Sequence, residues 1–207
     1  MKFYSQQYED VVLFKKYLNY RNGYFIELGA MDGVRYSNTK FFEDHLNWTG
    51  ILLEPEKSQF LQLKQNRSNC ITLDYAISEI DGEVLFNGRP NDACGGIIET
   101  IIHNKNELKD SENYFVKSKP FYKIFEEIGK PKQVDLFVVD VEGGELAILK
   151  TFDWSIPVYI VVIETAEQNS TNQDCRKILA NNGFEFDMVL GCNEVWINKN
   201  FKRKIGE

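Results

Sequence analysis

Two strongly apolar segments constrain the fold of this chain most: VDLFVVDVEGG (residues 134–144) and VYIVVIET (158–165). Both are typical of buried strands, and a helical stretch, ELAILKTF (145–152), separates them. Parallel strands need long crossover connections, which place helices on the faces of the sheet. We therefore expect an α/β fold with a mostly parallel sheet and helices on both faces.

The remaining sequence continues this alternation of strands and helices. Further strands are expected at 24–30, 50–56 and 70–78. Residues 83–86 are expected to form a fourth strand or the hairpin partner of the third. Helices are expected at 8–20, 37–48, 56–67, 121–129 and 172–182. Residues 184–190 and 194–199 predict a closing antiparallel hairpin. Residues 87–120 interrupt the rhythm and are too long for an ordinary connection, so we expect an acceptor-binding insertion there. We expect one domain over 1–207, with an N-terminal helical segment at 1–22.

Charge and composition exclude several classes of function. The chain has 207 residues, a net charge of −7 and a pI of about 5.1, which disfavours nucleic acid and anionic membranes as partners. Its four cysteines lack zinc-site spacing, the N-terminus does not resemble a signal peptide, and the longest apolar run is too short to span a bilayer. These features predict a reduced, soluble, cytoplasmic protein.

Acidic residues stand at the ends of four predicted strands. They are Glu27 with Asp32, Glu54, Asp140 with Glu142, and Glu164. In an open α/β sheet, ligands bind beyond the carboxyl ends of the strands. Acids at four such ends therefore indicate a shared cleft.

The turn after the first predicted strand, ELGAMDG (27–33), indicates the kind of ligand. It lacks the G-x-G-x-x-G pattern of dinucleotide folds, and its acids disfavour a pyrophosphate. An uncharged or positively charged ligand is expected instead. S-adenosylmethionine fits, with its ammonium and sulfonium near the turn and its ribose diol at Glu54. The alternative is a turn in which glycine only relieves crowding.

Three stretches resemble a known family: GYFIELGAMDGVRYSNTKFFEDHLNWTGILLEPE (23–56), NR (66–67) and VDLFVVDVEGGELAILK (134–150). They are similar to the FkbM-type S-adenosylmethionine-dependent methyltransferases, and the resemblance extends from YSQQYED (4–10) to the closing hairpin. It implies a Rossmann-like class I methyltransferase fold with a seven-stranded sheet. It also implies methylation of a hydroxyl, for which a sugar or glycan is the preferred acceptor.

The resemblance also implies which residues bind the cofactor. The methionine end would be lined by Glu27, Gly29, Ala30, Asp32 and Gly33, and the same wall would be completed by Ser37, Asn38 and Thr39. Glu54 would hold the ribose hydroxyls, and Asp140 would mark the end of the cofactor site opposite Glu54. The adenine would be flanked by Ala76 and Ile77 beside Asp74, and Gln6 would cover the cofactor.

Methyl transfer to an aliphatic hydroxyl needs a positioned base or a metal ion, because the hydroxyl is a weak acid. In one mechanism Glu142 or His103 is the general base beside Asp140. In the other, which we slightly favour, Asp140 and Glu164 hold Mg²⁺ or Mn²⁺, as the corresponding positions do in catechol-type methyltransferases. Each of these residues also has a simpler interpretation. Glu142 could cap the following helix, and His103 could be an ordinary surface residue.

Two other classes of function remain open. A nicotinamide-dependent oxidoreductase would use Glu54 for a ribose but lacks the glycine fingerprint. A non-catalytic cofactor-binding module would retain the fold without the reaction. The acceptor is the least constrained ligand. Candidates for binding a sugar are Asp92, Asn104, Tyr114, Phe115, Phe121 and Tyr122, although aromatic residues in such a stretch often belong to the core.

Overall fold

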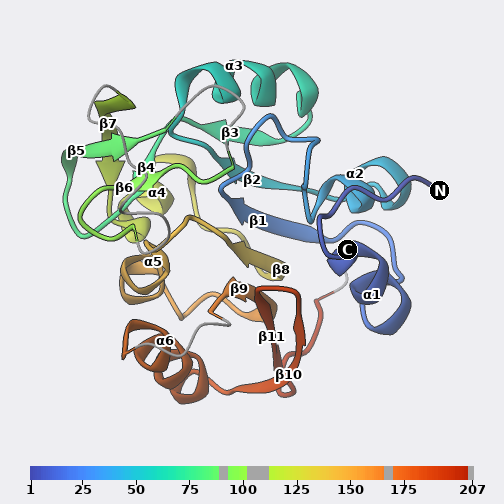
Figure 1. Cartoon of the computed structure of the whole chain (residues 1–207). Coiled ribbons are helices and arrows are strands. Elements are labelled where there is room, and N and C mark those ends of the chain that lie inside the picture. Colours follow the sequence, from blue (N-terminus) through green and yellow to red (C-terminus); the bar gives the residue numbers. More distant parts are fainter. Residues whose placement is uncertain (89–92, 102–111, 166–169, 205–207) are drawn as a thin grey trace.

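A seven-stranded sheet forms the centre of the computed structural model, which describes residues 1–88, 93–101, 112–165 and 170–204 (Figure 1). The strand order is β10-β11-β9-β8-β1-β2-β3; β11 is antiparallel to β9 and β10, and the other neighbours are parallel. The predicted parallel sheet with a closing antiparallel hairpin is confirmed. The strands are β1 (Tyr24–Leu28), β2 (Thr49–Leu53), β3 (Ile71–Leu73), β8 (Val134–Val139), β9 (Val158–Glu164), β10 (Phe184–Leu190) and β11 (Asn193–Asn198).

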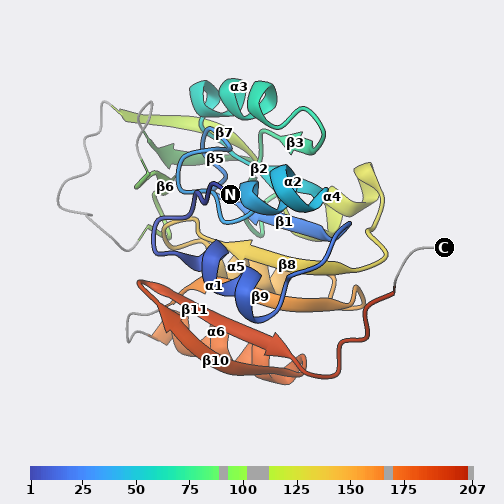
Figure 2. The same ribbon diagram turned by 90° about the vertical axis from the view of Figure 1, so that its right-hand side faces the viewer.

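Helices cover both faces of this sheet, as expected. Successive side chains of β1 show why: Phe25 packs in the core with Phe41, whereas Ile26 packs in the opposite core with Phe121. The first face carries α1 (Glu9–Lys16), α2 (Lys40–Leu46) and α3 (Lys57–Asn66), and the second carries α4 (Phe121–Ile128), α5 (Glu145–Thr151) and α6 (Ser170–Asn181). Figure 2 looks onto the face covered by α1 and α2. Within the described residues, no helix has the length and apolar character needed to cross a membrane.

The predicted strand at 70–78 is wrong in one respect, because it is divided between two sheets. β3 ends at Leu73, and β4 (Ala76–Ile77) belongs to a second sheet of order β4-β7-β5-β6. The predicted segment at 83–86 lies in β5 (Gly82–Asn87), which pairs with β7 (Asn113–Lys119) instead of the third strand. β6 (Gly96–Ile97) completes this sheet. Much of the described insertion is therefore sheet, and its excursion begins before residue 87.

The N-terminal segment is less helical than predicted, since α1 spans only Glu9–Lys16. Before α1 the chain is fixed by the buried Asp10, whose carboxylate accepts hydrogen bonds from the Tyr4 amide (2.7 Å) and the Ser5 hydroxyl (2.6 Å). Ser5 also forms a β-bridge with Tyr36. These contacts compete with helical hydrogen bonding and lay the segment across the carboxyl end of the sheet.

Candidate active site

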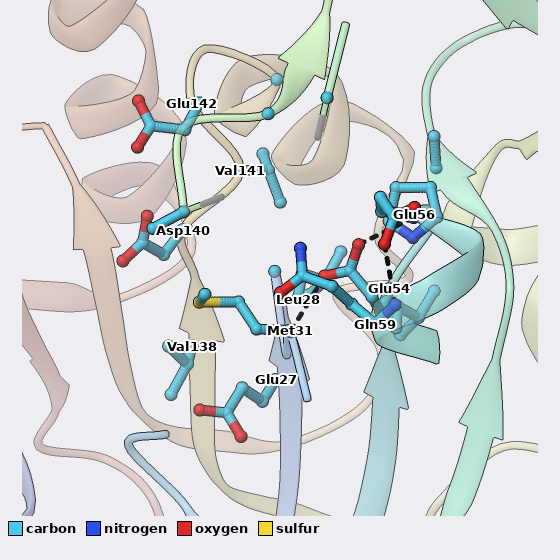
Figure 3. A pocket seen from close by; sticks show the side chains of 18 of the residues that line it. Glu27, Leu28, Met31, Glu54, Glu56, Gln59, Val138, Asp140, Val141 and Glu142 are labelled. Carbon is cyan, nitrogen blue, oxygen red and sulfur yellow. Dashed lines mark hydrogen bonds between the residues drawn. The ribbon is translucent and has the colours of Figure 1, made fainter. Parts of the chain in front are cut away.

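A pocket lies at the carboxyl ends of the central strands, where the strand order reverses between β1 and β8 (Figure 3). Eleven of the predicted site residues line it: Gln6, Glu27, Gly29, Ser37, Asn38, Glu54, Ala76, Ile77, Asp140, Glu142 and Glu164. Five others lie beside the lining and not in it: Ala30, Asp32, Gly33, Thr39 and Asp74. His103, Asp92 and Asn104 lie outside the described residues. Of the six acids predicted at the four strand ends, all but Asp32 therefore line one cavity.

Glu27 organises the wall that precedes α2. It points to the same face of β1 as Phe25, and its carboxylate accepts hydrogen bonds from the Asn38 amide (2.7 Å), the Ser37 hydroxyl (3.0 Å) and the Thr39 hydroxyl (2.5 Å). The side-chain oxygen of Asn38 is buried and has no hydrogen-bond partner among the described residues, and Asn38 lines the pocket. An unpaired buried acceptor fits a ligand with an N–H donor, such as the ammonium of S-adenosylmethionine.

The glycine turn has a different role at each of its positions. Gly29 has a φ of +73°, and a Cβ there would lie 1.9 Å from the Asp140 carbonyl oxygen. Only glycine lets the ends of β1 and β8 approach this closely. Asp32 accepts hydrogen bonds from the amides of Val34 (2.8 Å) and Arg35 (2.7 Å), so it caps the turn.

Glu54 follows β2 and is almost completely buried. Its carboxylate accepts one hydrogen bond from the Met31 amide (2.9 Å) and one from the Glu56 amide (2.7 Å), which leaves acceptor capacity on both oxygens for the two hydroxyls of a ribose (Figure 3). Burial raises the pKa of Glu54 to about 7. The Glu56 side chain itself caps α3 by accepting from the Gln59 amide (2.7 Å).

The raised pKa of Glu54 predicts a dependence of stability on pH. The folded protein keeps a proton on Glu54 between about pH 4.5 and 7 that the unfolded chain releases, so stability falls as the pH rises through this window. We expect the free energy of unfolding of the wild type to fall relative to Glu54→Gln, which cannot titrate, by about 3 kcal/mol between pH 4.5 and 8. Urea unfolding of both proteins across this range measures the difference, and a constant difference would contradict the assignment.

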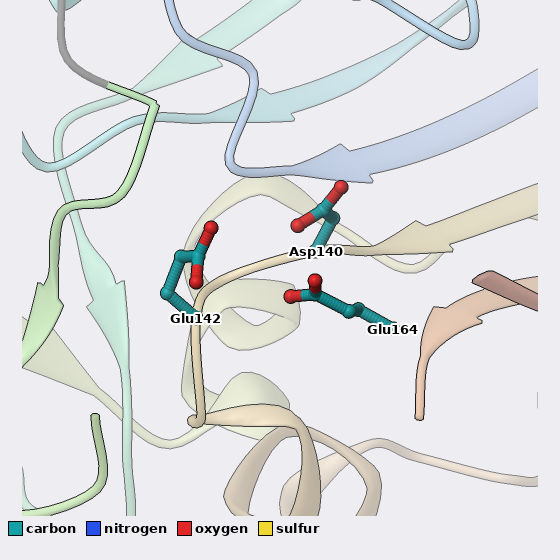
Figure 4. Close-up of side chains that lie close together, drawn as sticks. All are labelled: Asp140, Glu142 and Glu164. Atoms are coloured by element: carbon teal, nitrogen blue, oxygen red, sulfur yellow. The ribbon is translucent and has the colours of Figure 1, made fainter. Parts of the chain in front are cut away.

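Three carboxylates converge at the ends of β8 and β9 (Figure 4). One oxygen from each of Asp140, Glu142 and Glu164 lies within 4.8 Å of the other two. Glu142 has a left-handed backbone (φ 59°), and Glu145, which follows in the first turn of α5, accepts a hydrogen bond from the Gly143 amide (3.1 Å). Glu145 thus holds the loop that presents Glu142.

The proximity of these acids shifts their protonation. Burial, followed by repulsion from Glu164, raises the pKa of Asp140 well above its usual range. Burial, followed by repulsion from Glu142, raises the pKa of Glu164 to about 7. Several negative charges at this distance are unfavourable unless a proton or a cation lies between them. Carboxylate oxygens are the ligands that Mg²⁺ and Mn²⁺ prefer, so the three residues fit a divalent ion.

The N-terminal segment and the turn before β11 meet at the pocket. The pocket lining includes Gln6, which was predicted to cover the cofactor, and Cys192, which was not predicted. The turn before β11 packs on the N-terminal segment: a Cβ at Gly191 would lie 2.4 Å from the Gln7 side chain. No sequence pattern pairs positions so far apart, so Cys192 could not have been identified in advance.

The second sheet supplies the remaining wall. Besides the predicted Ala76 and Ile77, the residues of the insertion and its flanks that line the pocket are Tyr75, Phe86, Gly88, Ala93, Gly95 and Ile97, which were not predicted. The aromatic residues proposed for the acceptor are placed differently: Phe121 is in the core, Phe115 and Tyr122 are exposed, and Tyr114 is half-buried. Asp74 pairs with Lys117 (2.8 Å) outside the lining. The acidic ends of the central strands and a mixed wall from the second sheet together form the cavity.

Comparison with known proteins shows which protein family this chain belongs to. The family model of the methyltransferase FkbM domain matches residues 27–186, which is most of the chain. The crystal structure of methyltransferase FkbM from Methylobacillus flagellatus has a TM-score of 0.55 at 14% identity and covers 91% of this chain. This chain spans 47% of that protein, about half its length. At this identity the likeness establishes the Rossmann-like class I methyltransferase fold.

Other solved structures are similar at lower scores. Aeropyrum pernix fibrillarin, in complex with natively bound S-adenosyl-L-methionine, has a TM-score of 0.48 at 12% identity, covering 93% of this chain and 73% of that one. A TehB-like S-adenosylmethionine-dependent methyltransferase from Corynebacterium glutamicum has a TM-score of 0.45 at 10% identity, covering 92% and 87%. No curated protein matches the sequence significantly.

Proposed function

Because this chain belongs to the FkbM methyltransferase family, we propose that it transfers a methyl group from S-adenosylmethionine to a hydroxyl of a sugar or glycan. The family match supports a methyltransferase over the nicotinamide-dependent oxidoreductase that the fold alone would allow. The observation that carries the finer proposal is the position of Asp140, Glu142 and Glu164 in the same pocket as Glu54.

These residues divide the pocket into two functional ends. Asn38 and Glu54 offer acceptor atoms for the ammonium and ribose of S-adenosylmethionine, which supplies a methyl group activated by its sulfonium. The three carboxylates at the other end hold the acceptor hydroxyl in line with that methyl group and take up its proton as the oxygen–carbon bond forms, while the carbon–sulfur bond breaks and neutral S-adenosylhomocysteine leaves.

We further propose that Asp140, Glu142 and Glu164 hold Mg²⁺ or Mn²⁺. A divalent ion would lower the pKa of the acceptor hydroxyl and relieve the repulsion from Glu164, which adds to burial in raising the pKa of Asp140. Its three protein oxygens would leave open positions for the acceptor.

The charge of the lining supports a neutral acceptor. Glu27, Glu54, Glu56, Asp140, Glu142 and Glu164 give the described lining six carboxylates, and Arg35 is its basic residue. Such a surface repels phosphorylated or carboxylated acceptors and accepts hydrogen bonds from hydroxyls. A neutral sugar with vicinal hydroxyls fits this requirement.

Metal removal gives the first test. We expect treatment with EDTA to lower the rate of methyl transfer to neutral sugars by about 100-fold or more, and Mg²⁺ or Mn²⁺ to restore it. Formation of S-adenosylhomocysteine with a panel of neutral, acidic and amino sugars measures the rate.

The outcomes separate the parts of the proposal. Undiminished turnover after thorough chelation would contradict the metal and leave a carboxylate base. Tight binding of S-adenosylmethionine with no methylated acceptor in any panel would favour a non-catalytic binding module.

A further inference from the structure

Arg67, from the NR motif, is a completely buried cation directly behind the pocket. It follows the last turn of α3, and its guanidinium extends under the segment 33–39. Nη1 donates hydrogen bonds to the Gly33 carbonyl (3.0 Å) and the Ser37 hydroxyl (3.2 Å), and Nη2 donates to the Thr39 hydroxyl (2.9 Å). One side chain therefore ties together both ends and the middle of this segment.

The same guanidinium also balances buried negative charge. Its Nε donates to the Glu43 carboxylate, and Nη1 lies 3.8 Å from the Glu27 carboxylate. Glu27 in turn accepts hydrogen bonds from Ser37 and Thr39, the two hydroxyls that Arg67 contacts. Removal of one partner from such a buried network leaves an uncompensated charge.

Gly33 accommodates this arginine. It has a φ of +79°, and a Cβ there would lie 2.7 Å from Cγ of Arg67 and 2.6 Å from the Leu63 side chain. The second glycine of the ELGAMDG turn therefore gives space to the arginine stem and not to a ligand.

We propose that Arg67 is a positioning residue for the cofactor. Its planar fork fixes the segment 33–39 so that Ser37 and Asn38 face the pocket, where both line the cavity. Arg67 touches neither reactant and acts only through this wall. The inference rests on S-adenosylmethionine being the methyl donor.

Arg67→Lys tests the proposal, because lysine keeps the charge but cannot replace the several directed N–H groups of the fork. We expect the Kd for S-adenosylhomocysteine to rise about tenfold or more, which corresponds to about 1.4 kcal/mol. The KM for S-adenosylmethionine should rise in parallel, while kcat at saturating cofactor and the KM for the acceptor stay within about threefold of wild type. Calorimetry and steady-state kinetics measure these values.

Arg203→Lys is the matched control. Arg203 also donates to backbone carbonyls, those of Arg21 (2.8 Å) and Asn22 (3.1 Å), and it lies 3.4 Å from Asp135 near the start of β8, at the edge of the sheet opposite the pocket. We expect it to lower the urea midpoint without changing the Kd for S-adenosylhomocysteine. An equal weakening of binding by both variants at matched stability would show a global effect and overturn the proposal.

Thr39 supplies a second pair of variants if Arg67→Lys does not fold. Thr39 lies outside the pocket lining but bonds both Glu27 and Arg67. Thr39→Val should weaken binding of S-adenosylhomocysteine about threefold or more, and Thr39→Ser should restore it to within about twofold of wild type. Wild-type affinity in folded Arg67→Lys or Thr39→Val would overturn the positioning role alone, whereas absence of binding by the wild type would overturn the proposed donor.

Discussion

Asp140→Asn is expected to lower the rate of methyl transfer by about 10²- to 10⁴-fold, the range typical of a lost acid–base group. The substitution removes a carboxylate from the acidic end of the pocket, and with it the proposed metal ligand or proton acceptor. Affinity for S-adenosylhomocysteine should change by less than about threefold, because this product carries no sulfonium charge for Asp140 to attract. Single-turnover assays with saturating cofactor measure the rate, and calorimetry measures the affinity.

Asp135→Asn is the control for this prediction. Asp135 is a buried aspartate near the start of β8, the strand that Asp140 follows, and it accepts hydrogen bonds from the Tyr24 amide and the Tyr20 hydroxyl, each at 2.8 Å. We expect it to reduce stability while the folded fraction retains wild-type turnover. A comparable loss of turnover in Asp135→Asn, or near wild-type turnover in Asp140→Asn, would contradict a chemical role for Asp140.

Gly29→Ala should abolish binding of S-adenosylhomocysteine and destabilise the protein by about 2–5 kcal/mol. About 1–2 kcal/mol of this comes from placing alanine in a left-handed conformation, and about 1–3 kcal/mol from overpacking. The overpacking is severe because the new Cβ would meet the Asp140 carbonyl, which is backbone and cannot rotate away. The ends of β1 and β8 would have to separate, and the pocket is built between them.

Gly129→Ala is the control that separates the conformational cost of a Gly→Ala substitution from the cost of overpacking. Gly129 has a φ of +85°, but a Cβ there would have no heavy atom within 4 Å. Its ψ of 154° places it in a backbone region that is essentially restricted to glycine, so we expect this variant to lose only the conformational part, about 1–3 kcal/mol, and to bind S-adenosylhomocysteine like the wild type. Equal destabilisation of both variants in urea unfolding would show that close approach at Gly29 is not important.

The sequence predicted the acidic side of the pocket well. Strand ends could be located because each apolar run stops at an acid, as at Glu27, Glu54 and Glu164. Parallel strands bring such ends to one edge of a sheet, so their meeting in one pocket follows from topology. The parallel sheet with its closing hairpin followed from the same runs, and the number of seven strands from the family resemblance.

Residues 71–77 and the glycine turn show what could not be predicted. The chain leaves the main sheet after Leu73, but apolar residues continue to Ile77, so periodicity gives no sign of the change of partner. In the turn, sequence alone does not indicate which side of the backbone faces a ligand. Gly33 was therefore assigned to the cofactor although its space is taken by Arg67.

The two ends of the second-sheet excursion are neighbours. β4 pairs with β7 at Ile77 and Lys119, and the hydroxyls of Ser78 and Ser118 lie 2.6 Å apart. A chain segment that leaves and returns at one point can be lengthened, shortened or exchanged at small entropic cost, and the strands of the main sheet need not move. Because this segment also carries Phe86 and Ile97 into the pocket, the proposed function would allow changes in this segment to alter the choice of acceptor, while the central strands that carry Glu27 and Glu54 stay unchanged.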